Sequence, residues 1–295
     1  AAGGILQTFA SLGAPLLGFV SIFSIGMIAR CYSAYHLKQK HEPLILPNQE
    51  PDRIVNWAFL KQHPNFLRFS LFFVCMQLAV AISGPFVVVY LLRDLHFNYM
   101  ELTLNTGASV LMQFVVLNRW GRLGDLFGNR IILRVTGFAI PAIPLLWIVS
   151  SNYYYLLALQ MLSGLIWSGY SLSASNFLFD LTPTHRRAGM MSMHNVAAGI
   201  AVFIGASLGG YLTTIAPQQF TIPGFETSTI SVFMTVFLVS AIARMIVASV
   251  FLPRIRAVKR MTYQGLIFRI TRFSPISGVI FEHIASRRRK ETEED

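Results

Sequence analysis

Charged residues are scarce in this sequence. Only 13% of its 295 residues are Asp, Glu, Lys or Arg, about half of what a soluble domain usually carries. Hydrophobic residues make up 54%, and they gather into blocks long enough to cross about 30 Å of hydrocarbon. The shortage of charge therefore argues against soluble domains and predicts a helical bundle in a lipid bilayer.

Cysteine is nearly absent as well. Cys31 and Cys75 are the only two, and neither their number nor their surroundings favour a disulfide framework or a metal cluster. The histidines lack ligand-like spacing, and no phosphate-binding loop, nucleophile elbow or zinc motif occurs. We therefore expect no enzyme activity, no cofactor and no metal.

Acidic residues are outnumbered by basic ones, 13 to 24, which gives a net charge of +11. Nucleic acid is one partner of basic proteins, but here the basic residues lie between apolar blocks and not along one soluble face. We therefore expect no nucleic-acid partner. No Asp or Glu falls within an apolar block, so these blocks carry no candidate for a proton or ion relay.

Seven apolar stretches are long enough to span a bilayer as helices. They cover residues 5–30, 66–92, 103–119, 131–150, 154–179, 189–214 and 229–252. Pro85, Pro141 and Pro144 interrupt them, which a membrane helix tolerates where other groups satisfy the freed carbonyls. No stretch alternates with a period of two, which argues against a β-barrel. The expected fold class is an all-α, polytopic membrane protein.

The basic residues predict the orientation of the spans. All but two of the 24 Lys and Arg residues fall in alternate connections or in the C-terminal tail, and the exceptions are Arg93 and Arg244. By the positive-inside rule the basic side is cytoplasmic. We therefore expect the N-terminus of this chain outside and its C-terminus in the cytoplasm, in what is expected to be a bacterial inner membrane.

Residues 121–130, GRLGDLFGNR, form the most informative segment, expected as a short cytoplasmic connection between two spans. The segment resembles the signature loop of the major facilitator superfamily, G-x-L-x-D-x-x-G-x-R/K, with matches at Gly121, Leu123, Asp125, Gly128 and Arg130. In that family the loop joins the second and third helices of each six-helix half, and here it joins the second and third spans after the longest connection. The competing interpretation is a tight turn that carries arginines only because it faces the cytoplasm.

A second cytoplasmic connection, residues 180–189, supports the resemblance. It is similar to the acidic, proline and Arg-Gly pattern between the fourth and fifth helices of a half, and contains Asp180, Pro183, Arg186, Arg187 and Gly189. We hypothesise that Asp180 pairs with Arg122 or Arg130, and that Asp125 caps the helix beginning near Gly189. Such a lock would stabilise one arrangement of the bundle and break when the bundle rearranges.

The resemblance implies a domain organisation. Residues 1–30 would hold the last helix of an N-terminal half, 31–65 a cytoplasmic central loop, 66–252 a six-helix C-terminal half, and 253–295 a basic cytoplasmic tail. The chain begins Ala-Ala-Gly-Gly without a methionine, and we expect it to be a fragment that lacks the first five helices. The expected function is secondary active transport of a small solute, with the lipid bilayer, the missing half and a coupling ion or proton as partners. The alternative is a membrane-embedded scaffold or enzyme without transport activity.

The family also implies that the first and fourth helices of each half line the substrate path. Polar residues of the corresponding spans are therefore cavity candidates: Gln77, Ser83, Gln160, Trp167, Tyr170, Ser171 and Asn176. Interhelical hydrogen bonding is an equally good interpretation for each of them, and Asn105 and Gln113 are weaker candidates. Arg244, inside the last span, is expected to snorkel to the cytoplasmic face or to make a structural pair in preference to binding substrate.

Two further features are assigned to packing. Ala201, Gly205 and Gly209 recur every four residues, a stripe of small residues that suits close helix contact. The run around them faintly resembles an antiporter motif of the superfamily but has Ala206 where that motif has proline. His194 is expected at a polar helix interface and not in a proton relay.

Overall fold

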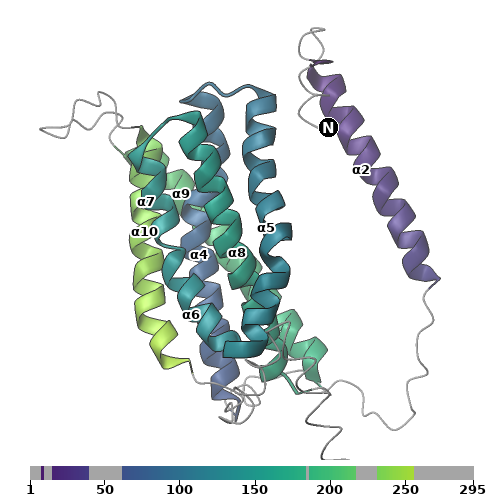
Figure 1. Ribbon diagram of the computed structural model, residues 1–295, viewed down its shortest axis with the longest axis vertical. Helices are drawn as coiled ribbons and strands as arrows, with labels where there is room; N and C mark the ends of the chain where they lie inside the picture. Colours follow the sequence, from purple (N-terminus) through teal and green to yellow (C-terminus); the bar gives the residue numbers. More distant parts are fainter. Residues whose placement is uncertain (1–7, 10–14, 40–61, 184–185, 217–230, 256–295) are drawn as a thin grey trace, which may run out of the picture.

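The computed structural model describes residues 8–9, 15–39, 62–183, 186–216 and 231–255. Every regular element in these ranges is a helix, with no β-strand among them. The main helices are α2 (Pro15–Lys38), α4 (Pro64–Arg93), α5 (Tyr99–Phe127), α6 (Asn129–Ala139), α7 (Ala142–Val149), α8 (Tyr153–Leu181), α9 (Arg187–Ile215) and α10 (Val232–Phe251). The predicted all-α class is therefore confirmed (Figure 1). The predicted central loop and tail lie largely outside the described residues.

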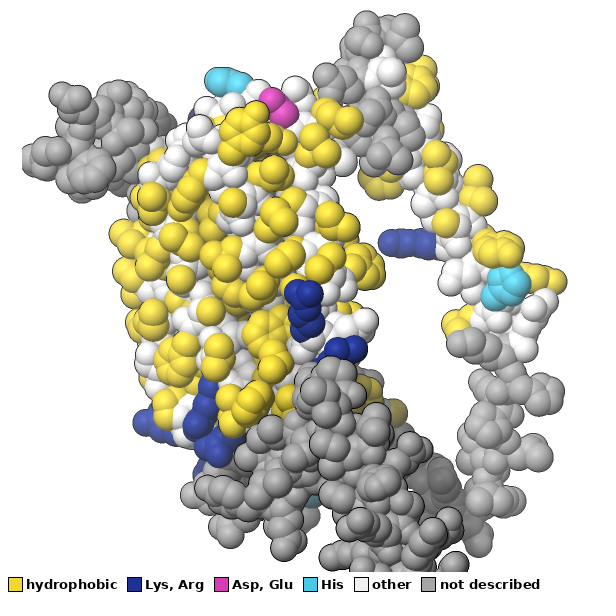
Figure 2. All heavy atoms as spheres, viewed as in Figure 1, with side chains coloured by type: hydrophobic (Ala, Val, Ile, Leu, Met, Phe, Trp, Pro, Cys, Tyr) yellow, Lys and Arg dark blue, Asp and Glu magenta, His cyan; other side chains and the backbone are white. Residues whose placement is uncertain are grey.

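Six helical spans within the described residues are long and apolar enough to cross a bilayer: Leu16–Lys38, Pro64–Arg93, Tyr99–Phe127, Asn129–Val149, Arg187–Ile215 and Val232–Arg254. The 29-residue helix α8 is as long, but serines, Gln160 and Asn176 interrupt its apolar sequence. Apolar side chains cover most of the visible side of the bundle in Figure 2. The protein is therefore an integral membrane protein, and α8 is a polar member of its bundle.

Two helices extend beyond the predicted spans. Helix α2 continues to Lys38, whereas the predicted span ended at residue 30. Helix α5 begins at Tyr99, where Asn98 and Glu101 form a reciprocal capping box, and ends only at Phe127. Hydropathy marks where hydrocarbon contact stops, but backbone hydrogen bonding continues into the polar region.

The third span of the bundle is broken where the prolines predict. Helix α6 ends at Ala139, and α7 begins at Ala142. Pro144 has no N–H, so the carbonyl of Ile140 loses its helical donor. That carbonyl accepts from the N–H of Ile143 at 3.2 Å and from Arg244 Nη1 at 3.5 Å. A local turn and a side chain of a neighbouring helix therefore share the carbonyl that Pro144 leaves without its helical donor.

Helix pairing in the bundle follows an internal repeat. Helix α4 packs mainly on α9, and α5 packs mainly on α8; α10 covers α4, and α6 covers α8. The first three spans of the bundle correspond in order to the last three: α4 to α8, α5 to α9, and α6–α7 to α10. If each span is replaced by its counterpart, the same pairings result. Because α4 and α8 run in opposite directions, the repeat is inverted, as in many secondary transporters.

Glycines allow the two main pairs to approach closely. A Cβ at Gly205 or Gly209 of α9 would lie 2.3 or 2.1 Å from the carbonyl oxygens of Leu78 and Ile82 on α4. In the other pair, a Cβ at Gly164 of α8 would lie 2.2 Å from the carbonyl oxygen of Ser109 on α5. The predicted packing role of the stripe on α9 is confirmed, and Gly164 is its counterpart in the other pair.

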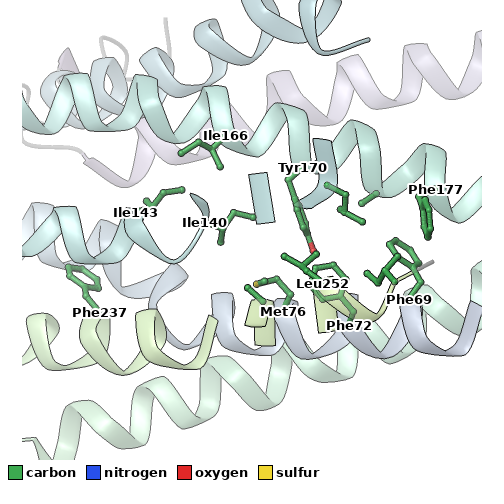
Figure 3. Packing of buried hydrophobic residues seen from close by; sticks show 14 of the residues in the cluster. Phe69, Phe72, Met76, Ile140, Ile143, Ile166, Tyr170, Phe177, Phe237 and Leu252 are labelled. Atoms are coloured by element: carbon green, nitrogen blue, oxygen red, sulfur yellow. The ribbon is translucent and has the colours of Figure 1, made fainter. Parts of the chain in front are cut away.

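Aromatic side chains fill the interior between α4 and α8. Figure 3 shows Phe69, Phe72 and Met76 of α4 facing Tyr170 and Phe177 of α8, and all five are buried. The rings of Phe69 and Phe177 lie 5.1 Å apart. Because lipid tails are as apolar as these side chains, packing and not water exclusion holds the helices together.

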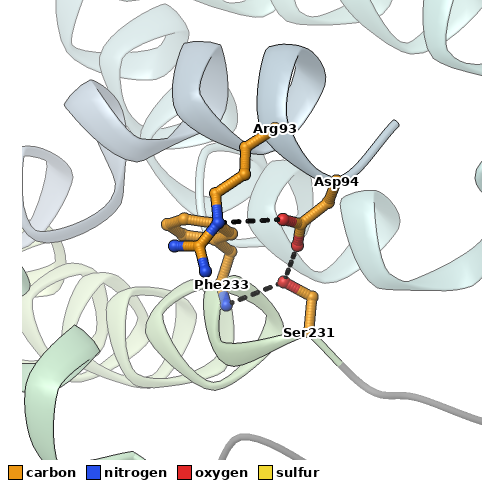
Figure 4. Close-up of polar contacts among 4 residues, drawn as sticks. All are labelled: Arg93, Asp94, Ser231 and Phe233. Carbon is orange, nitrogen blue, oxygen red and sulfur yellow. Dashed lines mark hydrogen bonds and ion pairs between the residues drawn. The ribbon is translucent and has the colours of Figure 1, made fainter. Parts of the chain in front are cut away.

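A polar cluster joins the C-terminal end of α4 to the N-terminal end of α10 (Figure 4). Ser231 Oγ donates to Asp94 Oδ2 and accepts from the backbone N–H of Phe233 at 3.2 Å. Arg93 Nε lies 4.0 Å from Asp94 Oδ1. Ser231 is the N-cap of α10, so a single hydroxyl both caps this helix and connects it to the end of α4.

Replacing Ser231 with alanine is expected to lower the free energy of unfolding by about 1 kcal/mol, the usual cost of losing a serine N-cap. The measurement is thermal unfolding of the purified protein in detergent. Ser207→Ala is the control, because Ser207 is exposed on α9 and its loss should change stability by less than about 0.5 kcal/mol. Equal effects of the two substitutions would contradict the capping role.

Helix α2 stands apart from the bundle that α4 to α10 form (the six-span bundle, with α6 and α7 counted as one span) in Figure 1. Its apolar side chains are exposed, for example Leu16 at 79% and Phe23 at 74%. A ring contact of 6.5 Å between Phe19 and Tyr99 connects α2 with the start of α5. The helix therefore has apolar surface that the bundle does not cover.

Candidate functional site

The segment 121–130 is almost entirely helical, which corrects the expected connection. Helix α5 includes Gly121 to Phe127, and α6 begins at Asn129. Gly128 alone joins the two helices, with φ 85° and ψ 145°. Its N–H donates to the carbonyl of Gly124 at 2.9 Å, and its carbonyl accepts from the N–H of Ile131 at 3.1 Å. One residue ends the first helix and starts the second because glycine tolerates a positive φ.

The turn at Gly128 contacts the C-terminal part of α8. Asn176 Nδ2 donates to Asn129 Oδ1 at 3.5 Å, and a Cβ at Gly124 would lie 3.0 Å from the same oxygen. Asn176 was a cavity candidate, but the structure locates its exposed side chain at this turn. Leu123 and Asp125 are exposed on the last turns of α5, whereas Arg130 is half-buried.

The second motif, residues 180–189, joins α8 to α9. Arg187 Nη2 donates to the carbonyl of Thr182 at 3.5 Å, and its guanidinium lies 5.3 Å from the ring centre of Phe179. Arg187 therefore contacts the end of α8 from the first turn of α9. Asp125, Asp180 and Arg186 each have a partner, and the proposed pairing of Asp180 with Arg122 or Arg130 stays a prediction.

Arg134, on α6, makes a contact with the end of α10 that the two motifs did not predict. Its Nε and Nη2 donate to the carbonyls of Leu252 at 3.1 Å and Pro253 at 2.9 Å. These carbonyls follow the C-terminus of α10, where a cation is favourable. In the sequence, Arg134 is distinguished only by its position one helical turn after Arg130. That spacing cannot identify a partner 118 residues away.

Three of the predicted cavity residues line one pocket of ≈ 270 Å³. Ser83 comes from α4, and Gln160 and Trp167 come from α8. Ser163, Trp147 and Arg244 also line this pocket. Three of the residues chosen by helix order and polarity therefore line the same pocket.

A second pocket, of ≈ 340 Å³, lies along α5 and α8. Ser171, another predicted cavity residue, lines it together with Gln113, Ser168 and Ser175. The remaining candidates lie elsewhere: Gln77 is half-buried on α4, and Tyr170 is fully buried and stacks on Phe73 with ring centres 6.1 Å apart.

Arg244 does not snorkel, which corrects the first of its two expected roles. Only 4% of the residue is exposed. Its Nη2 donates to Ser83 Oγ at 2.7 Å and to the carbonyl of Val80 at 3.4 Å. Ser83 in turn donates to Ser240 Oγ at 3.0 Å. The side chain turns inward because α4 and the α6–α7 break offer it acceptors, which the position of Arg244 in the sequence does not reveal.

His194 lies at the interface of α4 and α9, as predicted. Its Nδ1 is 2.8 Å from Ser70 Oγ, and its ring stacks on Phe69 at 6.1 Å with the planes only 8° apart. A hydroxyl and aromatic rings surround it, so the contacts of this histidine are those of a packed interface residue.

Comparison with known proteins agrees with this geometry. No curated protein matches the chain. The family model of the Major Facilitator Superfamily matches residues 69–264, which include the turn at Gly128, the α8–α9 connection and both pockets. The superfamily consists of membrane transporters and not of enzymes. The chain therefore belongs to the major facilitator superfamily.

Proposed function

We propose that this chain forms one wall of a secondary active transporter, which moves a small solute across the membrane by alternating access. The observation that carries the proposal is the polar face of α8, where Gln160 lines one pocket and Ser171 lines another. Polar side chains are expensive inside a span and usually face a bundle interior or a cavity. Transporters with inverted repeats hold substrate near the middle of the bilayer, where their repeats meet.

The six-span bundle is proposed as the C-terminal half of a twelve-helix transporter, with α2 as the sixth helix of the N-terminal half. The exposed apolar surface of α2 supports this assignment, since such a surface suits packing against further helices or lipid. The partners would be the bilayer, a small solute, the other half and a coupling ion or proton.

The proposed location is a bacterial cytoplasmic membrane, with the turn at Gly128 facing the cytoplasm. Figure 2 supports this orientation, because the described Lys and Arg side chains of the bundle gather toward its lower end, where α5 meets α6. The positive-inside rule assigns such an end to the cytoplasm.

Uptake into membrane vesicles that contain the full-length protein tests the proposal. A panel of labelled sugars, amino acids, organic anions, peptides and drugs should include at least one solute whose uptake is saturable and abolished by ionophores. Vesicles without the protein are the control. If no solute enters faster than in these control vesicles, the alternative of a membrane scaffold or an enzyme without transport activity takes precedence.

The proposed cytoplasmic lock makes a second prediction. Asp180→Arg is expected to lower the uptake rate at least tenfold while the melting temperature changes little, because a lock between helices affects exchange between states more than folding. A compensating Arg122→Asp or Arg130→Asp substitution should restore part of the rate. Independent effects of the single substitutions would show that no such ion pair forms, a result that a double-mutant cycle detects.

A further inference from the structure

The pocket beside Arg244 combines apolar walls with one buried cation. Its volume of ≈ 270 Å³ is slightly below the range of about 300–1,000 Å³ that is usual for small-molecule sites. Trp147, Trp167 and Phe237 contribute aromatic surface, and Gln160 and Ser163 contribute polar groups. A compact, largely apolar ligand with one polar end suits these dimensions and this lining.

The guanidinium of Arg244 has only neutral hydrogen-bond partners among the described residues: two carbonyls and the hydroxyl of Ser83. Its Nε is buried and has no partner in the structure. An arginine keeps its charge in proteins, and a buried charge is costly unless it is paired. None of the predicted membrane spans contains Asp or Glu, so the spans themselves supply no carboxylate to pair with it.

The hydrogen bonds of Arg244 also have a structural role, because they connect α10 to α4 and to the α6–α7 break. That role accounts for Nη1 and Nη2 but leaves Nε without an acceptor. The structural role also does not explain why a pocket lies beside this arginine. A carboxylate in the pocket, which Arg244 lines, would supply the missing negative charge.

We propose that this pocket binds the carboxylate end of a small, amphipathic monocarboxylate, with Arg244 as the residue that selects the anion. This inference rests on the proposed function, since it names the class of solute that the transporter carries. Trp147 and Trp167 pack against the apolar body of the solute. Arg244 is then a specificity-determining residue, because a neutral ligand of the same shape would leave its charge unpaired.

The test uses 4-bromobenzoate and its neutral analogue 4-bromobenzamide as probes for the purified full-length protein in detergent. Bromine quenches tryptophan fluorescence at short range, and two tryptophans line the pocket. Saturable quenching by the benzoate is expected at concentrations at least tenfold below those at which the benzamide acts. Equal quenching by both probes, or no saturable quenching by the benzoate, would overturn the proposal.

Substitutions localise the site. Arg244→Gln should raise the half-saturating concentration of 4-bromobenzoate at least tenfold, while Arg244→Lys, which keeps the charge, should raise it less. Trp147→Phe and Trp167→Phe should each reduce the quenching amplitude. Trp120→Phe is the matched control and should leave it unchanged, since Trp120 donates to the carbonyl of Leu165 at 2.9 Å and does not line the pocket.

Each result decides the inference separately from the proposed function. If Arg244→Gln does not fold, the contrast between the two probes on the unsubstituted protein and the tryptophan variants still decides it. Undiminished binding by a folded Arg244→Gln variant would overturn the role of Arg244. Ionophore-sensitive uptake of a neutral solute without benzoate binding would contradict the carboxylate site and support the proposed transport function. Benzoate binding without uptake of any solute would support the carboxylate site and contradict the proposed transport function.

Discussion

Replacing Gly209 with alanine is expected to destabilise the bundle, although alanine is the better helix former. The new methyl group would lie 2.1 Å from the carbonyl oxygen of Ile82, and this backbone atom moves only if α4 and α9 separate. Overpacking of this kind costs about 1–3 kcal/mol. Thermal unfolding in detergent should show a lower melting temperature for Gly209→Ala, and the double variant with Gly205→Ala should yield little folded protein.

Gly199→Ala is the matched control for this prediction. Gly199 lies on the same helix, and a Cβ there would meet no heavy atom within 4 Å. The substitution should therefore be neutral or stabilise the protein by up to about 1 kcal/mol, the helix-propensity advantage of alanine. Similar melting temperatures for the two alanine variants would show that α4 and α9 do not approach each other as closely as described.

Replacing Gly128 with alanine is expected to cost about 1–3 kcal/mol, because a side chain at φ 85° and ψ 145° is held in a region that only glycine readily occupies. The strain would fall on the one residue that joins α5 to α6, in the segment proposed to take part in the conformational change. We therefore expect Gly128→Ala to lower both the melting temperature and the rate of solute uptake, measured on the same preparation.

Gly121→Ala separates this backbone requirement from the general abundance of glycine in the motif. Gly121 is helical, and the nearest outside atom to its Cβ would be Leu172 Cδ2 at 4.0 Å, an ordinary contact. Its replacement should leave the melting temperature unchanged or higher. If Gly121→Ala destabilised the protein as much as Gly128→Ala, the positive φ would not explain the glycine at the turn.

The buried cluster around Arg244 indicates how much of the site the sequence could predict. Ser83, Gln160 and Trp167 were identified because helix order in the superfamily says which spans face the path. For Arg244 the sequence left two roles open, snorkelling to the membrane surface, which its distance from the end of the span allows, and a structural pair. Which way a long side chain turns depends on the acceptors around it, and the acceptors for Arg244 come from Val80 and Ile140, which are more than 100 residues away in sequence.

The motif at residues 121–130 shows a similar division. Matching residues identified the family and the position of the turn between two spans. The sequence did not reveal that most of the motif is helical, because hydropathy falls at the membrane edge while the helix continues. The link from Arg134 to Leu252 and Pro253 was missed for a related reason, since contacts between distant spans leave no periodic signal.

The sequence by itself determined the class of this protein. Its apolar blocks, the distribution of its arginines and the residues of two short motifs specify a helical membrane protein of the major facilitator superfamily, because these properties are local and act on each span separately. Only the tertiary structure decided which glycines bring helices together, where α5 ends, and that the guanidinium of Arg244 turns into a pocket. These features depend on surfaces that meet only when all six spans of the bundle are packed.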